Sequence, residues 1–500
     1  MKYWIERFTN RVTMEKLILY CLFAVFAFAL LLSVFGQLAF SPLALIVSFA
    51  VLIFASYGLN LLFGYLFGVG VSYESPVITA LILGLIVPPA LTPAGLGMLV
   101  LIALVAMASK FVLVVRGRHL FNPAAIAVLL VGFTGLQYAT WWVATPALLP
   151  IVALGAFVIA FKTRHLLMVS LFLLTSGTLI IGSSLLVGAM FGTAFAYALF
   201  SWPIVFFGGY MLTEPLTLPP RRWQKILLAV LAGIGVALPF SVAGISSSPE
   251  LVLVLMNIVA FLWGQRRGIR LELKEVRLVT PTVKEFLFSV PSPVRFLPGQ
   301  YMEIHLPQKK PDSRGTRRSF SIIGVPGEQT ISLSVKMPEK PSSFKRALNE
   351  LAVGTKLKAT RVSGDFVLPK DSNKSLLYIA GGIGITPFVS HVRALQKDSD
   401  TRDITLLYAV ANTEEAAYID VFLAAGVKVV VVTSDIRSRI EGVAYINAPY
   451  ITQEVLSNSV VDARSRRAYV SGPPLMVTAV DPLLKNAGVR EIQKDYFIGY

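Results

Sequence analysis

The sequence predicts a multi-domain protein: an all-α polytopic membrane domain of about ten helices, then an antiparallel β-barrel, then an α/β domain with a parallel sheet. Three observations predict this class. The 500 residues have a mean hydropathy of +0.69, which is too high for a soluble protein. Only 12 of the 45 Lys and Arg residues and 5 of the 28 Asp and Glu residues precede residue 266. Beyond that point the long apolar runs give way to strand-like patterns. We therefore expect domains at 1–265, 266–371 and 372–500.

The first half consists of apolar runs separated by short polar connections. Crossing a hydrocarbon core of roughly 30 Å takes about 20 apolar residues. Runs that meet or approach this length lie near 15–37, 42–63, 76–90, 95–115, 121–137, 143–161, 165–187, 190–210, 225–243 and 250–265. The run at 76–90 is short, and 165–210 is almost continuous. The pattern predicts about ten spans in the lipid bilayer.

The basic residues predict the orientation of these spans. They lie at the N-terminus, in alternate connections and after the last run, at Lys2, Arg7, Arg11, Lys16, Arg116, Arg118, Lys162, Arg164, Arg221, Arg222, Lys225, Arg266, Arg267 and Arg270. The opposite connections 133–146 and 238–250 contain no Lys or Arg. Because cytoplasmic loops are enriched in these residues, we expect a multi-pass protein of the cell (inner) membrane with both termini in the cytoplasm. The same effect accounts for much of the net charge of +17, so no nucleic-acid partner is expected.

Cysteine and histidine are scarce. Cys21 is the one cysteine, which excludes disulfides within the chain, cysteine-ligated iron–sulfur clusters and Cys-rich zinc sites. No metal site is expected. The chain has four histidines, and those of the polar half, His305 and His391, are expected to be structural or surface residues.

The second half changes period twice. Short runs such as "VKEFLFSV", "QYMEIHL" and "TISLSVK", separated by turns such as Pro298-Gly299, predict the small antiparallel barrel. After about residue 372, apolar strands alternate with helical segments, which predicts a parallel sheet with crossover helices. The turn "AGGIGITPF" (380–388) lies between a buried strand and a helix. Backbone N–H groups there can bind a pyrophosphate, although a plain strand–helix turn has the same pattern.

Six motifs in order, "PGQYMEI", "RRSFSI", "SGDFVL", "AGGIGITPF", "YVSGPP" and a final "DYFIGY", resemble the ferredoxin–NADP reductase superfamily over roughly 230 residues. The resemblance implies an FAD site and an NADH or NADPH site. It places FAD at Arg318, Ser319, Phe320, Ser321, Val335, Lys336, Ser342 and Ser343, with Phe497 or Tyr500 covering the flavin. Phe320 replaces the family's tyrosine and so lacks its hydroxyl. The glycine usual in the second stretch is missing.

The same resemblance places the nicotinamide dinucleotide at Gly381, Gly382, Gly384, Thr386, Pro387, Asn412, Ser471, Gly472 and Pro473. Ser471 replaces a cysteine that lies near the nicotinamide in the family. No catalytic acid or base is expected, because hydride transfer depends on positioning. Glu414, Glu415 and Asp435 favour NADH, whereas Arg437 and Arg439 keep NADPH open.

The membrane half resembles the D subunit of Rnf complexes and the B subunit of sodium-translocating NADH:quinone reductases. The matching segments are "ESPVITALILGLIVPPALTP", "ASKFVLVVRGRHLFNPAA" and "GYMLTEPLT". Those relatives carry membrane flavin, but their Ser-Gly-Ala-Thr attachment sequence is absent from the 133–146 connection, so no covalent FMN is expected. A non-covalent FMN or riboflavin is predicted at Arg118, His119, Asn122, Thr213, Glu214 and Thr217. The alternative is that these segments only pack broken helices.

A haem relay like that of ferric reductases or NADPH oxidases is not expected, because the membrane half has only His119 and His165, both near predicted helix ends. The resemblances imply a membrane NAD(P)H oxidoreductase. It passes hydride to FAD, then single electrons to a membrane flavin and on to a quinone or an extracytoplasmic redox protein. Two alternatives stay open. One is a redox-driven Na⁺ or H⁺ transporter, and the other is a membrane-anchored reductase of a soluble cytoplasmic acceptor.

Overall fold

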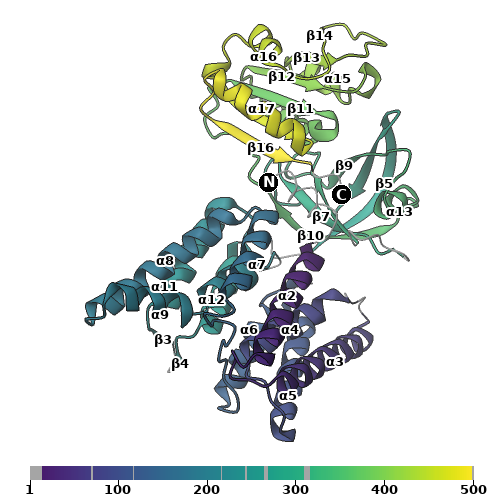
Figure 1. Ribbon diagram of the computed structural model, residues 1–500. Coiled ribbons are helices and arrows are strands. Elements are labelled where there is room, and N and C mark those ends of the chain that lie inside the picture. Colours follow the sequence, from purple (N-terminus) through teal and green to yellow (C-terminus); the bar gives the residue numbers. More distant parts are fainter. Residues whose placement is uncertain are drawn as a thin grey trace. The chain divides into compact units, whose positions relative to one another are not determined.

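A computed structural model describes residues 14–68, 71, 73–215, 217–242, 245–263, 268–308 and 316–497, apart from Arg116 and Gly117. The chain divides after Arg267 into a helical unit and a unit that contains two sheets (Figure 1). Each unit is described by itself.

The helical unit is built from apolar helices joined by short connections. They are α2 (Met14–Val34), α3 (Pro42–Leu66), α4 (Glu74–Ile86), α5 (Pro93–Val112), α6 (Pro123–Phe133), α7 (Leu149–Lys162), α8 (Leu166–Leu186), α9 (Phe191–Phe200), α10 (Ile204–Phe206), the π-helix η1 (Phe207–Met211), α11 (Arg222–Ala237) and α12 (Pro249–Trp263). Proline sets several boundaries. Pro42, Pro93 and Pro123 each occupy a first helical turn, where a missing N–H costs nothing.

Helix length limits how many of these segments qualify as spans. Four of the described helices, α2, α3, α5 and α8, are long and apolar enough to cross a membrane. Helix α9 and the segment 204–211 qualify together as a fifth, bent by 49°. Each of the other predicted runs holds a shorter helix; α4, for example, ends at Ile86, just before Pro88 and Pro89. The count of ten spans therefore stays a prediction.

The helical unit contains two series of helices that pack in the same way. In the first, α2 contacts α4, α3 contacts α5, and α5 contacts α6; in the second, α7 contacts η1, α8 contacts α11, and α11 contacts α12. A two-stranded hairpin precedes the last helix of each series: β1 (Val114–Val115) with β2 (Arg118–His119), and β3 (Ser241–Val242) with β4 (Ile245–Ser246). The two first helices, α2 and α7, contact each other, as do the two last helices, α6 and α12. The helical unit therefore consists of two copies of one helical arrangement, an internal repeat.

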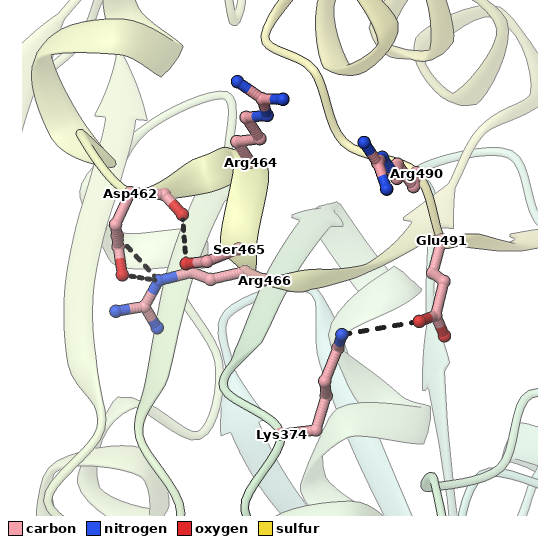
Figure 2. A pocket seen from close by; sticks show the side chains of 7 residues that line it. All are labelled: Lys374, Asp462, Arg464, Ser465, Arg466, Arg490 and Glu491. Carbon is pink, nitrogen blue, oxygen red and sulfur yellow. Dashed lines mark hydrogen bonds and ion pairs between the residues drawn. The ribbon is translucent and has the colours of Figure 1, made fainter.

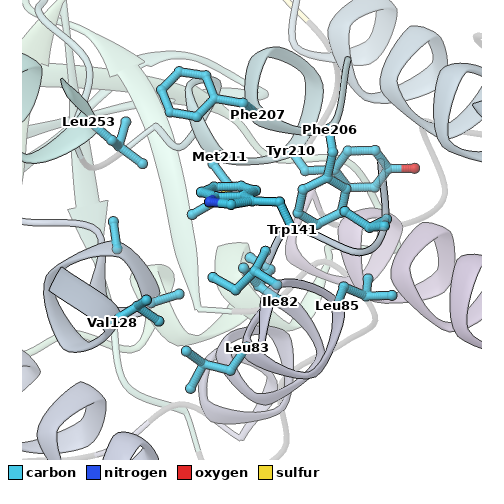
Figure 3. Close-up of a cluster of buried hydrophobic side chains, with 14 of the residues drawn as sticks. Ile82, Leu83, Leu85, Val128, Trp141, Phe206, Phe207, Tyr210, Met211 and Leu253 are labelled. Carbon is cyan, nitrogen blue, oxygen red and sulfur yellow. The ribbon is translucent and has the colours of Figure 1, made fainter. Parts of the chain in front are cut away.

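The core of this unit lies where the two series meet. Figure 3 shows Trp141 among side chains from both, including Ile82 of α4, Val128 of α6, Met211 of η1 and Leu253 of α12. Trp141 is 7% exposed, and its indole N–H donates to a carboxylate oxygen of Glu250 at 3.2 Å. The segment after α6 thus fills the junction between the repeats.

The second unit begins with a six-stranded antiparallel sheet in the order β8-β7-β10-β5-β6-β9. Its strands are β5 (Ile269–Thr280), β6 (Val283–Ser289), β7 (Tyr301–His305), β8 (Arg317–Ser321), β9 (Thr330–Lys336) and β10 (Lys356–Ser363), with α13 (Ser343–Asn349) between β9 and β10. One isolated bridge joins Ile323, after β8, to Ser332 of β9. The antiparallel sheet is present, while its closure into a barrel stays a prediction.

A six-stranded parallel sheet follows in the order β14-β13-β12-β11-β15-β16, as the alternating pattern predicted. Its strands are β11 (Leu376–Gly381), β12 (Ile404–Ala409), β13 (Lys428–Thr433), β14 (Val443–Asn447), β15 (Arg467–Gly472) and β16 (Ile492–Tyr496). Helices α14 (Thr386–Lys397) and α15 (Ile419–Ala424) share one core with the sheet, and α16 (Gln453–Ser459) and α17 (Pro474–Asn486) share the other. The strand order reverses between β11 and β15, where ligands of such sheets bind beyond the carboxyl ends of the strands.

Candidate functional site

The site forms where two glycine-containing loops leave neighbouring parallel strands. The loop after β11 contains Gly381, Gly382 and Gly384, and the turn after β15 contains Gly472 and Pro473. The two pack backbone against backbone: a Cβ added to Gly384 would lie 2.4 Å from the carbonyl oxygen of Ser471 and 2.7 Å from Cα of Gly472. Such a gap between two backbones admits only glycine. The structure thus brings together the two motifs that are predicted to bind the nicotinamide, which lie about 90 residues apart in the sequence.

Ser471 gives this junction an unusual polar group. The residue is fully buried, and its Oγ has no hydrogen-bond partner among the described residues. A buried hydroxyl without a partner is costly unless a ligand or water satisfies it. The residues present therefore fit a bound polar group at the switch point, as expected for the nicotinamide end of a dinucleotide.

The loop after β11 is held by a tyrosine hydroxyl and leads into a helix. The hydroxyl of Tyr408 donates to the carbonyl of Gly382 at 3.1 Å and accepts from the N–H of Ala417 at 3.3 Å. Thr386 and Pro387 open the 12-residue helix α14, whose free N–H groups can bind an anionic ligand. The Thr386 hydroxyl itself donates to the carbonyl of Ile383 at 3.0 Å, so it also stabilises the turn.

The ends of β12 and β13 carry the groups that bear on coenzyme choice. The Asn412 side chain accepts from the N–H of Glu415 at 3.1 Å and caps a short 3₁₀ turn. Arg437 donates to Asp435 at 2.9 Å and to Glu414 at 3.1 Å. Its guanidinium is therefore held between two carboxylates, an arrangement that favours a dinucleotide without a 2′-phosphate.

The FAD motif on β8 forms a buried cation–aromatic cluster. Arg318 is 4% exposed, and its guanidinium carbon lies 5.1 Å from the ring centroid of Phe344. The rings of Phe320 and Phe344 are 5.8 Å apart, Ser319 is exposed, and Ser321 is buried. Phe344 was not among the predicted residues, although it directly follows Ser342 and Ser343. An aromatic residue directly after two predicted contacts was the available signal.

The second predicted FAD stretch lies beside this cluster and is largely engaged in packing. Val335 is buried in the core of the antiparallel sheet, and Lys336 forms an ion pair of 2.5 Å with Glu415 of the parallel-sheet part. Ser342 caps α13 by accepting from the N–H of Lys345 at 3.3 Å, and Ser343 is the first residue of that helix. Their roles toward FAD stay predictions.

The end of the chain returns to the site. The backbone N–H of Phe497 donates to the carbonyl of Gly472 at 2.9 Å, so Phe497 is tied to the turn after β15. The backbone of Phe497 therefore lies beside the predicted nicotinamide residues, and its side chain is half-buried. Tyr500 lies outside the described residues.

Histidine 391 joins the two sheets of this unit. It is fully buried, and its Nε2 donates to the carbonyl of Phe366 at 2.9 Å. Burial lowers the pKa of His391 to about 4, from an ordinary value of 6.5. Gly299 leaves it room, since a Cβ there would lie 2.3 Å from Nε2. The histidine is structural in this position.

The lowered pKa of His391 predicts that the stability of the fold depends on pH. The unfolded chain binds a proton near pH 6.5, whereas the native imidazole resists it down to about pH 4, so stability falls as the pH drops through this window. The loss approaches about 3 kcal/mol at pH 4. We expect the unfolding temperature of the full chain, followed by release of FAD fluorescence, to fall between pH 6.5 and 4.5. His391→Gln, which cannot titrate, should flatten this slope, and an identical slope in the variant would contradict the assignment.

In the helical unit, the two segments predicted to hold a second flavin meet. Asn122 donates from its side-chain amide to the Glu214 carboxylate at 2.8 Å, across 92 residues of sequence. Its side-chain oxygen caps α6 by accepting from Ala125, and its backbone N–H donates to Oδ1 of Asn257 at 2.8 Å. Asn257, in the last helix, was missed because nothing in its sequence context sets it apart.

The remaining predicted members of this site are less engaged with one another. The Thr213 hydroxyl donates to the carbonyl of Gly209 at 2.8 Å, and the Thr217 hydroxyl donates to that of Glu214 at 3.2 Å, so both stabilise local backbone. Arg118 and His119 lie in β2, but their side chains are outside the described residues. Lys110, which the sequence did not single out, is 8% exposed and donates to the Ser75 hydroxyl at 2.9 Å.

Comparisons with known proteins bear on the second unit. Residues 378–481 match the family described as the oxidoreductase NAD-binding domain. The chain is 32% identical over 127 residues to methane monooxygenase component C of Methylosinus trichosporium, covering 25% of this chain and 36% of that protein. It is 30% identical over 206 residues to the flavohemoprotein of Bacillus subtilis, covering 40% of this chain and 50% of that protein. The chain thus spans half or less of these relatives.

Among solved structures, a cytochrome P450 reductase from Amycolatopsis has a TM-score of 0.40 at 24% identity, covering 46% of this chain and 70% of that one. A ferredoxin NADP⁺ reductase from Neisseria gonorrhoeae, with bound FAD and NADP, has a TM-score of 0.39 at 19% identity, covering 46% and 99%. The matched family and the sequence relatives support the resemblance of the second unit to NAD(P)H-dependent flavoprotein oxidoreductases. The resemblance of the helical unit stays a prediction.

Proposed function

We propose that the second unit is an NAD(P)H-dependent flavin reductase and that the helical unit carries its electrons into a membrane. The observation that carries the first half is the contact of Gly384 with Ser471 at the switch point, inside the stretch that matches the oxidoreductase NAD-binding domain. When bound, a reduced nicotinamide would supply the hydride and FAD would accept it. The protein's own contribution is placement.

Each group has a distinct part in this placement. The close-packed backbones at Gly384 and Gly472 would hold the nicotinamide at the strand ends, and Ser471 would offer it a buried hydroxyl. Arg318, buried against Phe344, presents a permanent positive charge for a pyrophosphate. Phe497, hydrogen-bonded to Gly472, supplies an aromatic ring beside the same turn. None of these residues exchanges a proton with substrate.

The electron path beyond FAD rests on the contact between Asn122 and Glu214. We propose that a non-covalent FMN or riboflavin binds beside this pair and accepts single electrons, and that a quinone or an extracytoplasmic redox protein accepts them next. The positions of the basic residues support a cytoplasmic reductase unit and a multi-pass helical unit in the inner membrane.

Counting flavins tests this path. We expect the full chain purified in detergent to hold two flavins, both released by acid precipitation because neither is covalently attached. Glu214→Gln should lower the content toward one flavin while NADH still reduces the remaining FAD at the wild-type rate. One flavin per wild-type chain would reject the membrane flavin and leave a membrane-anchored reductase of a soluble acceptor.

A second candidate function has an observation of its own. Lys110 and Glu214 are ionisable groups within a mostly apolar helical unit, and such residues often mark ion paths in membrane proteins. We therefore keep a redox-driven Na⁺ or H⁺ transporter as the alternative. Vesicles that contain the protein, supplied with NADH outside, would take up cations during turnover. Turnover without uptake would reject it.

Coenzyme preference provides a further prediction. NADH is expected to be the better substrate, because Glu414 and Asp435 neutralise Arg437. The double variant Glu414→Gln/Asp435→Asn leaves Arg437 available to a 2′-phosphate and should raise kcat/KM for NADPH relative to NADH by about tenfold. Asp420→Asn, at an exposed acid on α15, is the control. An unchanged ratio in the double variant would show that the 2′-phosphate position lies elsewhere.

A further inference from the structure

A pocket of about 600 Å³ lies at the amino ends of the parallel strands, whereas the nicotinamide loops lie at their carboxyl ends (Figure 2). Its residues come from three segments that lead into β11, β15 and β16, which are neighbours in the sheet. They are Lys374, Asp462, Arg464, Ser465, Arg466, Arg490 and Glu491. Because the strands are parallel, all these residues lie at the amino ends, about 20 Å along the strands from Gly384 and Ser471. The proposed reductase chemistry does not use this pocket.

Ion pairs divide the cations of the pocket into two kinds. Arg466, with a side chain 7% exposed, pairs with Asp462 at 2.8 Å and also with Asp403. Lys374 pairs with Glu491 at 3.4 Å, and Glu491 also binds Arg467. Both acidic residues of the pocket are therefore already paired with cations. Arg464 and Arg490 form no ion pair within the described part of the chain.

The stem of Arg464 packs on the turn between α17 and β16. Gly488 has φ +78°, a left-handed conformation that favours glycine, and a Cβ there would lie 3.2 Å from Cγ of Arg464. The stem of Arg464 thus packs on the turn that leads to Arg490. In Figure 2, Arg464 and Arg490 lie in the upper part of the view, with Lys374 below them. Two exposed guanidinium groups that form no ion pair in the described part of the chain therefore line a pocket whose other charged residues are ion-paired.

We propose that this pocket binds a phosphate-type anion, with Arg464 and Arg490 as its principal ligands. The guanidinium fork matches the oxygens of a phosphate, and two forks suit a diphosphate or a phosphodiester headgroup with a second anionic oxygen. None of the seven lining residues is aromatic, so the pocket selects charge and not a nucleobase. The source is either a soluble phosphate compound or the headgroup of an anionic phospholipid.

The test uses the full chain, with inorganic pyrophosphate in detergent as the soluble probe. At about 100 times its Kd, pyrophosphate should raise the unfolding temperature of the reductase unit by on the order of 5 °C. Any effect of pyrophosphate on the KM for NADH should be the same in the double variant, since the two sites lie at opposite ends of the strands. The shift should vanish in Arg464→Gln/Arg490→Gln and persist in Arg295→Gln, which alters an exposed arginine of the antiparallel sheet's part. Sodium chloride at equal ionic strength controls for screening.

The lipid source is tested in nanodiscs of phosphatidylglycerol and of phosphatidylcholine. If the headgroup is the ligand, the wild type should be more stable in phosphatidylglycerol, and the double variant should show no difference between the two lipids. If only pyrophosphate acts, the ligand is a soluble phosphate compound. The proposal is overturned if neither probe gives a shift that depends on Arg464 and Arg490.

Discussion

Gly384→Ala is expected to lower the rate of FAD reduction by NADH at least about 100-fold while leaving FAD bound. The new methyl carbon would lie 2.4 Å from the carbonyl oxygen of Ser471 and 2.7 Å from Cα of Gly472, far inside van der Waals contact. Both neighbours are backbone atoms, so the loop after β11 and the turn after β15 must separate. A displacement of about 1 Å costs a hydride transfer roughly two orders of magnitude.

Anaerobic stopped-flow reduction of FAD by NADH measures this effect. Dithionite, which needs no nicotinamide site, should reduce FAD equally in variant and wild type. Gly177→Ala, at a helical glycine with open space around it, provides a matched substitution that should leave the rate unchanged. A Gly384→Ala protein that NADH reduces at the wild-type rate would show that the two loops do not form the nicotinamide site.

Arg318→Ala is expected to remove FAD from the purified protein. Arg318 is 4% exposed and stacks on Phe344, so its charge is fixed and little hydrated. Each hydrogen bond from such a group to a phosphate contributes about 1.5–3 kcal/mol, and two of them account for a loss in FAD affinity on the order of 1,000-fold. Arg318→Lys keeps the charge without the fork and should retain FAD weakly.

The measurement is FAD per chain after gel filtration, with and without added FAD. Arg317→Ala, at the exposed neighbouring residue, is the matched control and should keep full occupancy. Circular dichroism checks that the variant remains folded. Phe344→Leu removes the ring beneath the guanidinium but keeps the charge, so it should weaken FAD binding less than Arg318→Ala does. Full FAD occupancy in folded Arg318→Ala would contradict this assignment.

Local sequence pattern was sufficient where the structure depends on neighbours along the chain. The run "SLLYIAGGIGITPF" predicted a buried strand, a turn and a helix, and the structure has β11, the glycine loop and α14 in that order. Pairing this loop with "SGPP" required the family resemblance, because about 90 residues separate them. Strands β11 and β15 are parallel neighbours, which confirms the predicted parallel sheet. The loops at their carboxyl ends therefore meet.

Contacts between segments that are distant in the sequence could not be predicted from it. Nothing near Phe344 indicates that Arg318 will stack on it, and nothing near Asn257 indicates that it accepts from Asn122. Such pairs arise from tertiary packing, which a single sequence does not record. The number of spans met a similar limit: hydropathy finds apolar runs, but α4 ends within one of them, just before Pro88 and Pro89.

The internal repeat of the helical unit has a chemical consequence. The carbonyl of Ile86, at the end of α4, accepts from the backbone of Trp141, and Trp142 donates to the carbonyls of Gly84 and Val87 at 2.9 and 3.1 Å. At the corresponding end of η1, the local turn satisfies the backbone, and the side chain of Glu214 reaches Asn122. The two copies of this scaffold have thus acquired different polar contacts: a carboxylate on an indole N–H at one, and a carboxylate on a side-chain amide at the other.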